Sequence, residues 1–236
     1  MAGTGTHSDN SKVYLFSRSS SSALWNYDAS GGVWSVSISA DGEYIVAGTY
    51  SPQLHVFDKD SSTPLWTYTP ASYMGSVRTA SISSDGHYVT ANVYYDNGSG
   101  DFGSKQYLFY RSSSTPIWKT DTLEDRCESI DMTASGDYFA VGCEDGELYL
   151  YTPSGLSWKT SLEREISSVS ISKDGNFITA ATGSGNAEVD EVFLFKKESN
   201  QSLWSYSIED SNGDDADAED VSISADGKYI VVAESE

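Results

Sequence analysis

The sequence predicts an all-β fold made of five copies of a four-stranded antiparallel unit. Three observations carry this prediction: a strand-and-turn composition, five alternating hairpins with a glycine turn, and five later strand pairs that end on tryptophan. Aromatic residues make up 13% of the 236 residues, and only 5 prolines occur. This composition favours strands over helices, and a chain of this length can bury a substantial core.

Each unit begins with an alternating strand, a tight turn and a second strand rich in aromatic and β-branched residues, the pattern of a β-hairpin. The five copies are SVSISADGEYIVAG from Ser35, TASISSDGHYVTAN from Thr79, SIDMTASGDYFAVG from Ser129, SVSISKDGNFITAA from Ser168 and DVSISADGKYIVVA from Asp220. Their turn glycines are Gly42, Gly86, Gly136, Gly175 and Gly227. A tight hairpin turn often needs a positive φ, which glycine adopts without a steric penalty.

Each unit continues with a third strand, a short polar turn and a fourth strand marked by tryptophan. The five copies end at Trp25, Trp66, Trp118, Trp158 and Trp204. Repetition at intervals of 39 to 52 residues is typical of a propeller, in which each repeat forms one blade around an axis.

The hairpin with its Ser-x-Asp-Gly turn resembles the repeats of WD-type propellers. The polar S-S-S-T-P turn before the strand tryptophan is similar to the pyrroloquinoline-quinone-type repeat of quinoprotein-like propellers. The resemblance covers nearly the whole chain and implies a five-bladed β-propeller. It implies little about function, because propellers host many unrelated activities. We expect no quinone cofactor, since those dehydrogenases are larger and no stacked Cys-Cys pair or metal-binding acid motif is recognisable here.

The order of the strands predicts how a ring would close. The chain opens with a third and fourth strand and ends with a first and second strand, so we expect the two ends to form blade 5 together and remove the exposed sheet edges. The expected single domain, 1–236, comprises blades at about 33–68, 77–120, 127–160, 166–207 and 219–236 with 1–27. A segment at Ala2 matches Ala47-Gly48-Thr49. An alternative is therefore a fragment of a larger seven- or eight-bladed propeller without autonomous function.

The charge of the chain argues against several classes of partner. A net charge of −21 repels phosphate backbones and anionic headgroups, so we expect neither nucleic acid nor membrane binding. No stretch reaches the roughly 18 apolar residues of a membrane span, and the first ten residues lack the features of a signal peptide. We expect a monomer and leave its location open, with an extracellular or cell-surface place favoured.

Candidate binding residues lie where the repeat stops being uniform. The loops after the second strand and before the first strand differ between blades, and variable loops on a rigid scaffold are the usual place for recognition. One position in the first strand, two residues outward from the core, reads Trp34, Arg78, Glu128, Ser167 and Glu219. Tyr94, Tyr95 and Asp101 lie in or beside the long second loop. Trp34 is either a stacking platform for a sugar or aromatic ligand, or a structural residue that plugs the channel or packs on a loop.

The sequence gives little support for catalysis or a metal. The histidines His7, His55 and His87 lack metal-ligand spacing, and no serine lies in a nucleophile motif. Glu128 and Glu219 are the one pair of acids in a register suited to glycoside hydrolysis, but a solvated acidic rim explains them as well. Asp210, Asn212 and Asp214 are weak calcium candidates, because the run fails the EF-hand pattern.

Two cysteines, Cys127 and Cys143, occur in blade 3. If residues 133–137 form an odd-length hairpin loop, these cysteines face each other directly across the hairpin and are close enough for a disulfide. The alternative is two reduced thiols. A disulfide would favour an exported protein.

The leading hypothesis for function is a non-catalytic binding or scaffolding propeller that presents variable loops to a protein or glycan. The alternatives are a lectin-like or glycan-active propeller that uses the channel mouth, and the fragment of a larger propeller described above.

Overall fold

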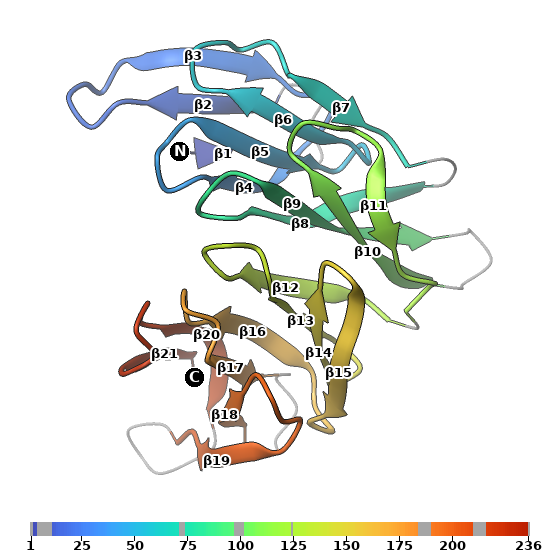
Figure 1. The fold of residues 1–236 in the computed structure, drawn as a ribbon, viewed down its shortest axis with the longest axis vertical. Helices are drawn as coiled ribbons and strands as arrows, with labels where there is room; N and C mark the ends of the chain where they lie inside the picture. Colours follow the sequence, from blue (N-terminus) through green and yellow to red (C-terminus); the bar gives the residue numbers. More distant parts are fainter. Residues whose placement is uncertain are drawn as a thin grey trace. The chain divides into compact units, whose positions relative to one another are not determined.

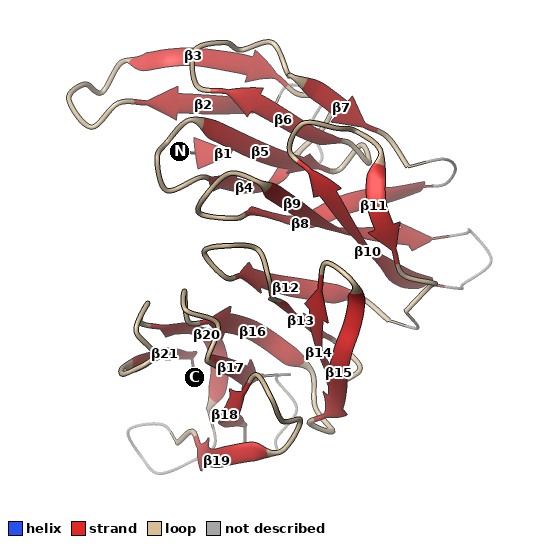
Figure 2. Ribbon diagram, viewed as in Figure 1, coloured by secondary structure: helices blue, strands red, loops and turns tan. Residues whose placement is uncertain are grey.

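The computed structural model describes residues 2–3, 11–70, 74–96, 102–123, 125–183, 190–209 and 216–235. Every regular element among these residues is a strand, as Figure 2 shows. The chain divides into two compact units, Met1–Glu124 and Asp125–Glu236, which are described separately below.

The first unit contains three antiparallel sheets, coloured blue to green in Figure 1. An N-terminal sheet consists of β1 (Ala2–Gly3), β2 (Lys12–Phe16) and β3 (Ala23–Asp28). Blade 1 consists of β4 (Val33–Ile38), β5 (Tyr44–Thr49), β6 (Leu54–Asp58) and β7 (Trp66–Tyr68). Blade 2 consists of β8 (Met74–Ile82), β9 (Tyr88–Asp96), β10 (Phe102–Tyr110) and β11 (Pro116–Lys119).

The second unit contains two four-stranded antiparallel sheets and a hairpin. Blade 3 consists of β12 (Cys127–Met132), β13 (Phe139–Cys143), β14 (Glu147–Thr152) and β15 (Gly155–Ser161). Blade 4 consists of β16 (Ile166–Ile171), β17 (Phe177–Thr182), β18 (Glu191–Lys196) and β19 (Ser202–Ser207). The hairpin consists of β20 (Asp217–Ile223) and β21 (Ile230–Ser235). The predicted all-β class with four-stranded antiparallel sheets is therefore confirmed.

The repeated hairpin turns have the backbone that the sequence predicts. All five turn glycines have a positive φ, between 69° and 76°. In blade 1, the Asp41 carboxylate accepts hydrogen bonds from the Ser39 hydroxyl and from the Glu43 amide, and the Ser39 hydroxyl oxygen accepts one from the Tyr44 amide. The Ser-x-Asp-Gly motif thus satisfies the polar backbone groups of its own turn.

The tryptophans fasten each blade to the next within a unit. Trp25 Nε1 donates to the Lys59 carbonyl oxygen at 2.7 Å, and Trp66 Nε1 donates to the Arg111 carbonyl oxygen at 2.6 Å. In the second unit, the Trp158 indole donates in the same way to Lys197 at 2.8 Å. Each acceptor follows the third strand of the neighbouring blade. This explains why the sequence repeats a tryptophan in the fourth strand rather than another large apolar residue.

The hydrophobic core lies between successive sheets. One buried cluster joins blades 1 and 2, and another joins blades 3 and 4. Phe57 and Phe109 are fully buried, with ring centroids 5.5 Å from Trp25 and Trp66 respectively. Burial of aromatic and aliphatic side chains between the sheets supplies the main driving force for this packing.

The two chain ends differ from the interior blades. The edge of β2 pairs with β1, in the register Gly3↔Val13, whereas the sequence predicted that the C-terminal strand would take this place. Among the described strands, β21 pairs only with β20. The predicted closure of the ring is therefore not part of the fold as described, and it stays a prediction.

Candidate functional site

The five positions that the sequence marked as variable share one structural feature. In every first strand, the pairing register shifts around the position occupied by Trp34, Arg78, Glu128, Ser167 or Glu219. Each of these residues is the extra residue of a β-bulge. A bulge bends the strand and re-aims one side chain without changing the rest of the sheet. The scaffold thus offers a repeated position at which the side chain is free to vary.

In the first unit, two bulge residues and a tyrosine of β9 form a stack. The guanidinium carbon of Arg78 lies 4.8 Å from the centroid of the Trp34 ring and 5.3 Å from the centroid of the Tyr94 ring, over both rings. The Trp34 ring centroid is also 6.4 Å from that of Tyr50, which directly follows β5. We call Trp34, Tyr50, Arg78 and Tyr94 the Trp34 platform. The structure thus brings together three sequence-predicted residues.

The Trp34 platform combines exposed aromatic surface with a held cation. Trp34 and Tyr50 are each 43% exposed, whereas Arg78 and Tyr94 are half-buried. A guanidinium over an aromatic face is attracted by the ring quadrupole, by about 0.5–2 kcal/mol depending on exposure. Residues 33–36 line a hollow of about 200 Å³ beside the indole. The Trp34 indole is therefore partly exposed beside this hollow.

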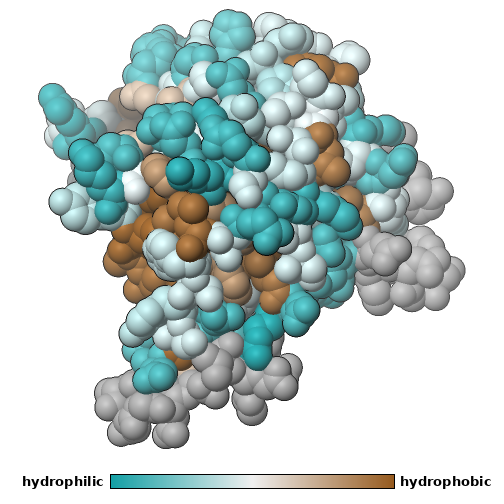
Figure 3. All heavy atoms as spheres, turned by 60° about the horizontal axis from the view of Figure 1, so that its bottom comes forward, coloured by the Kyte–Doolittle hydropathy of each residue, from teal (hydrophilic) through white to brown (hydrophobic). Residues whose placement is uncertain are grey.

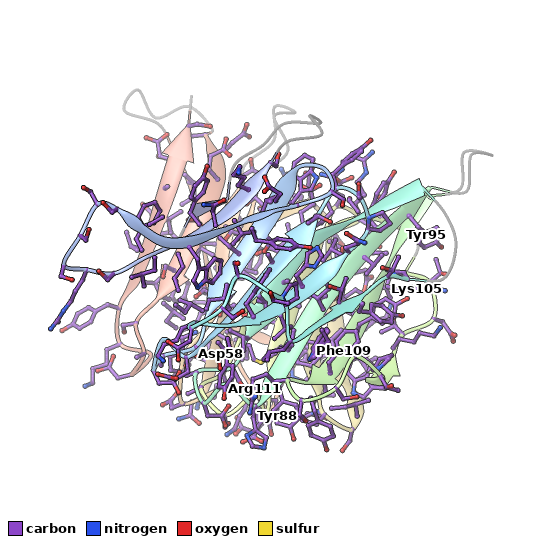
Figure 4. All side chains as sticks on the ribbon, turned by 90° about the horizontal axis from the view of Figure 1, so that it is seen from above. Asp58, Tyr88, Tyr95, Lys105, Phe109 and Arg111 are labelled. Carbon is purple, nitrogen blue, oxygen red and sulfur yellow. A yellow bond between two sulfur atoms is a disulfide. The ribbon has the colours of Figure 1, made fainter. Side chains whose placement is uncertain are left out.

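A second cation and aromatic pair lies at the loop end of blade 2. Lys105 Nζ is 5.8 Å from the centroid of the Tyr95 ring. Figure 4 shows Tyr95 and Lys105 at one end of the sheets and Asp58, Tyr88 and Arg111 at the other. Tyr95 was predicted from its place beside the long loop, and Asp101 of that loop lies outside the described residues.

The corresponding positions in the second unit are acidic. Glu128 and Glu219 are exposed, and Glu219 accepts a hydrogen bond from the Ser235 hydroxyl at 2.6 Å. Burial raises the pKa of Glu144 and of Glu165, and nearby carboxylates, including Glu128, raise both further, while Arg126 lowers them. This concentration of negative charge is typical of a solvated rim.

A carboxyl pair with one buried member was missed from the sequence. Asp190, just before β18, is 2% exposed, and burial together with a hydrogen bond to Asp217 raises its pKa to about 6. Arg164 Nη1 lies 3.7 Å from Asp190 Oδ1. Asp190 is one of many acids in an acidic loop, so only the tertiary contact with Asp217 distinguishes it.

Blade 2 also departs from the repeat inside its core. The difference concerns one facing pair of residues on the second and third strands, next to the bulge of the first strand. In the other blades this pair joins a small residue of the second strand to an aliphatic residue of the third: Gly48 and Leu54, Gly142 and Leu148, Ala181 and Val192. Blade 2 has Asn92 opposite Gln106 instead. Both side chains are buried, and their amide atoms have no hydrogen-bond partner in the described protein. Such groups normally carry a cost in stability.

Of the histidines and the weak calcium candidates, His55 and His87 lie in the described parts of the chain. These parts contain no cluster of three or more His, Cys, Asp or Glu side chains able to hold a metal ion. Asp210, Asn212 and Asp214 lie outside them, as does His7. His55 is buried in blade 1, where its ring meets that of Tyr27 edge-on at 5.1 Å. His87 is exposed.

Cys127 and Cys143 are joined by a disulfide that spans the β12–β13 hairpin. The two residues stand directly opposite each other in the pairing register, as the loop-length argument predicted. The bond closes a segment of 16 residues. It lies directly before the bulge residue Glu128, so it stabilises the base of one loop on the second unit.

Comparison with known proteins agrees with this architecture. A structural neighbour is the β-propeller domain of Cps50 (Swd1) from Myceliophteria thermophila, with a TM-score of 0.71 and 14% identity over 96% of this chain and 74% of that one. This likeness shows the fold alone. The search of curated proteins gives no match. No helix long and apolar enough to span a membrane occurs in the described ranges.

The family match is more specific and confirms the resemblance to quinoprotein-type repeats that the hairpin and tryptophan motifs indicated. Residues 9–236 match the quinoprotein-type repeat family described as outer membrane protein assembly factor BamB. Because the match covers nearly the whole sequence, the chain belongs to this family of β-propellers.

Proposed function

We propose that the chain is a non-catalytic binding or scaffolding propeller that recognises its ligand at the Trp34 platform. The observation that carries this proposal is the placement of Arg78 over the Trp34 and Tyr94 rings, with Trp34 and Tyr50 each 43% exposed. Exposed aromatic residues and arginine are the residue types most enriched at energetically important binding positions. Their position on bulges of rigid strands pre-organises them.

The family description supports a binding role rather than catalysis. It names an assembly factor, which is a role exerted through binding. We therefore propose that this chain has no enzymatic activity, and that its ligand is a protein or a glycan.

Two binding screens test the Trp34 platform directly. A glycan array and a phage-displayed peptide library should each be probed with the whole chain, with Trp34→Ala and with Tyr110→Ala. Tyr110 is a matched control because it is 46% exposed and lies in the same unit, paired with Tyr88 at the other end of blade 2. We expect Trp34→Ala to remove the hits and Tyr110→Ala to retain them. Hits that survive Trp34→Ala, or the absence of any hit, would refute the proposal.

We also propose that the chain closes into a five-bladed ring. The support comes from positions that are buried in every interior blade and exposed at one end. Phe16 is 40% exposed, whereas its repeat equivalents Phe57, Phe109, Tyr151 and Phe195 are buried. At the other end, Val231 is 67% exposed, whereas its equivalent Val46 is fully buried. In the view of Figure 3, hydrophobic residues gather in a patch among hydrophilic ones. A patch of this kind often marks a contact surface.

The pairing register of blade 1 gives a test of closure. Val46 pairs with Val56 there, so the equivalent pair is Val231 with Leu15. We expect a Leu15→Cys, Val231→Cys variant to form a disulfide within one chain, with a monomer mass by light scattering. The matched control is Leu24→Cys with Val231→Cys, because Leu24 is exposed on β3 away from this register. A bond between chains, or equal bonding in the control, would contradict the closed ring.

A further inference from the structure

Resting on the proposed function, we infer the chemical class of ligand that fits the Trp34 platform: a saccharide that carries a carboxylate. The ring of one sugar residue would stack on Trp34, and its carboxylate would pair with Arg78. This inference names a ligand chemistry for the site, and it makes the protein-ligand alternative an outcome of the test.

Arg78 provides the charge. Its guanidinium lies over the Trp34 and Tyr94 rings, so the side chain is already ordered before a ligand binds. An ordered arginine loses less conformational entropy on binding, and its planar fork matches a carboxylate through two parallel hydrogen bonds. A lysine at this position would supply the charge without the fork or the stacking.

Trp34 and Tyr50 provide the stacking surface. Their ring centroids are 6.4 Å apart with an interplanar angle of 36°, which forms a shallow open angle rather than a closed cage. The adjoining hollow of about 200 Å³ is smaller than the roughly 300–1,000 Å³ of sites that enclose a whole ligand. It therefore suits one ring-sized group at the end or side of a longer molecule.

The charge of the whole chain limits the number of anionic groups. With a net charge of −21, the protein repels a polyanion at distances up to about 10 Å, the Debye length at 0.1 M salt. Lys105 is a second basic side chain at the loop end of the same unit, over the Tyr95 ring. A short oligosaccharide with one to three carboxylates gains the local contact without the full long-range repulsion.

A matched ligand pair tests this inference. Calorimetric titration compares the galacturonic acid trimer with its fully methyl-esterified form, which has the same rings and no charge. For the unmodified chain, we expect the acid to bind at least 10-fold more tightly than the ester. We expect Arg78→Met to bring the two affinities within about 2-fold of each other, since the stacking surface remains and the charge is lost.

The control is a second arginine that also stacks on a ring. Arg111 lies 3.8 Å from the Tyr44 ring centroid, at the opposite end of the sheets in Figure 4. We expect Arg111→Met to keep the preference for the acid, with the folded state of each variant checked by its thermal unfolding temperature. Equal binding of acid and ester by the unmodified chain would overturn the ligand class, even if Trp34→Ala weakens both.

The remaining outcomes separate this inference from the proposed function. Binding of both trimers that is unaffected by Trp34→Ala would place the site elsewhere and overturn both. No binding of either trimer, with peptide-library hits that depend on Trp34, would overturn the saccharide and leave the platform as a protein-binding site.

Discussion

Protonation of His55 should be a main cause of acid instability in this protein. His55 lies in β6 and is 1% exposed, and its Nδ1 is 2.9 Å from the Thr67 hydroxyl oxygen. Its Nε2 is buried and has no hydrogen-bond partner among the residues that the structure describes. A second proton would therefore place a charge and an unsatisfied donor in an apolar environment. Burial lowers the pKa of His55 from 6.5 to about 4.

The sign and size of the effect follow from linkage. Between pH 6.5 and about 4 the unfolded chain binds the proton and the folded chain does not, so the free energy of unfolding falls as the pH falls. The shift corresponds to about 3 kcal/mol in total, at about 1.4 kcal/mol per pKa unit. Most of this loss should be complete at pH 4.5, since that pH lies two units below the unfolded value.

The assay is urea unfolding at pH 7 and pH 4.5 of the unmodified chain and of His55→Phe. Phe193 occupies the equivalent position in blade 4, so phenylalanine suits this site. We expect the variant to lose about 2–3 kcal/mol less than the unmodified chain on acidification. Parallel losses, with a difference below about 0.5 kcal/mol, would refute the reasoning. The comparison of two chains cancels the contribution of the many carboxylates, which also titrate in this range.

Three further predictions concern stability. Asn92→Ala with Gln106→Leu, which restores the small and aliphatic pair of the other blades, should raise the free energy of unfolding by about 1–3 kcal/mol in urea unfolding; a decrease would contradict the cost assigned to the buried amides. Reduction of the Cys127–Cys143 disulfide should lower the free energy of unfolding by about 3 kcal/mol for its 16-residue loop, and full alkylation of the denatured chain without reductant would show that the bond is absent. Asp190→Asn should stabilise the protein by about 1–3 kcal/mol at pH 7 but not at pH 4. The raised pKa of Asp190 makes the folded state lose stability as the pH rises from 3.8 through about 6; an equal effect at both pH values would contradict this.

The repeats made most of the fold predictable. A turn such as Ser39-x-Asp41-Gly42 satisfies its own backbone, and its strands alternate, so local sequence determines local structure there. The tryptophan positions were equally informative, because Trp25, Trp66 and Trp158 each donate a hydrogen bond to the next sheet of their unit. The pairing of β1 with β2 was not predicted, although the match of Ala2 with Ala47 contained the signal. The segment at Ala2 and the C-terminal strand both resemble the end of a second strand. Sequence alone does not decide which of the two pairs with the edge of β2.

The candidate site was only partly predictable. The shared register identified Trp34 and Arg78, and the long loop identified Tyr94, but nothing in the sequence indicated that Arg78 stacks on both rings. That contact depends on the bulges that re-aim the two side chains. Asp190 and Tyr50 were missed for a similar reason. The partner of each residue is more than 15 residues away in the chain, so no local pattern points to the contact.

The two stacked arginines of the first unit show how one interaction can serve structure or recognition. Arg111 lies 3.8 Å from the Tyr44 ring centroid, its Nε donates to the Gly86 carbonyl, and its own carbonyl accepts from Trp66. Every one of these contacts fastens blade 1 to blade 2 or the turn within blade 2, so stacking there is part of the repeated blade contact. Arg78 instead lies on a bulge, over a tryptophan that no other blade has at this position. The Arg78 contact leaves the Trp34 indole 43% exposed, and this open aromatic surface is the feature on which the proposed binding role rests.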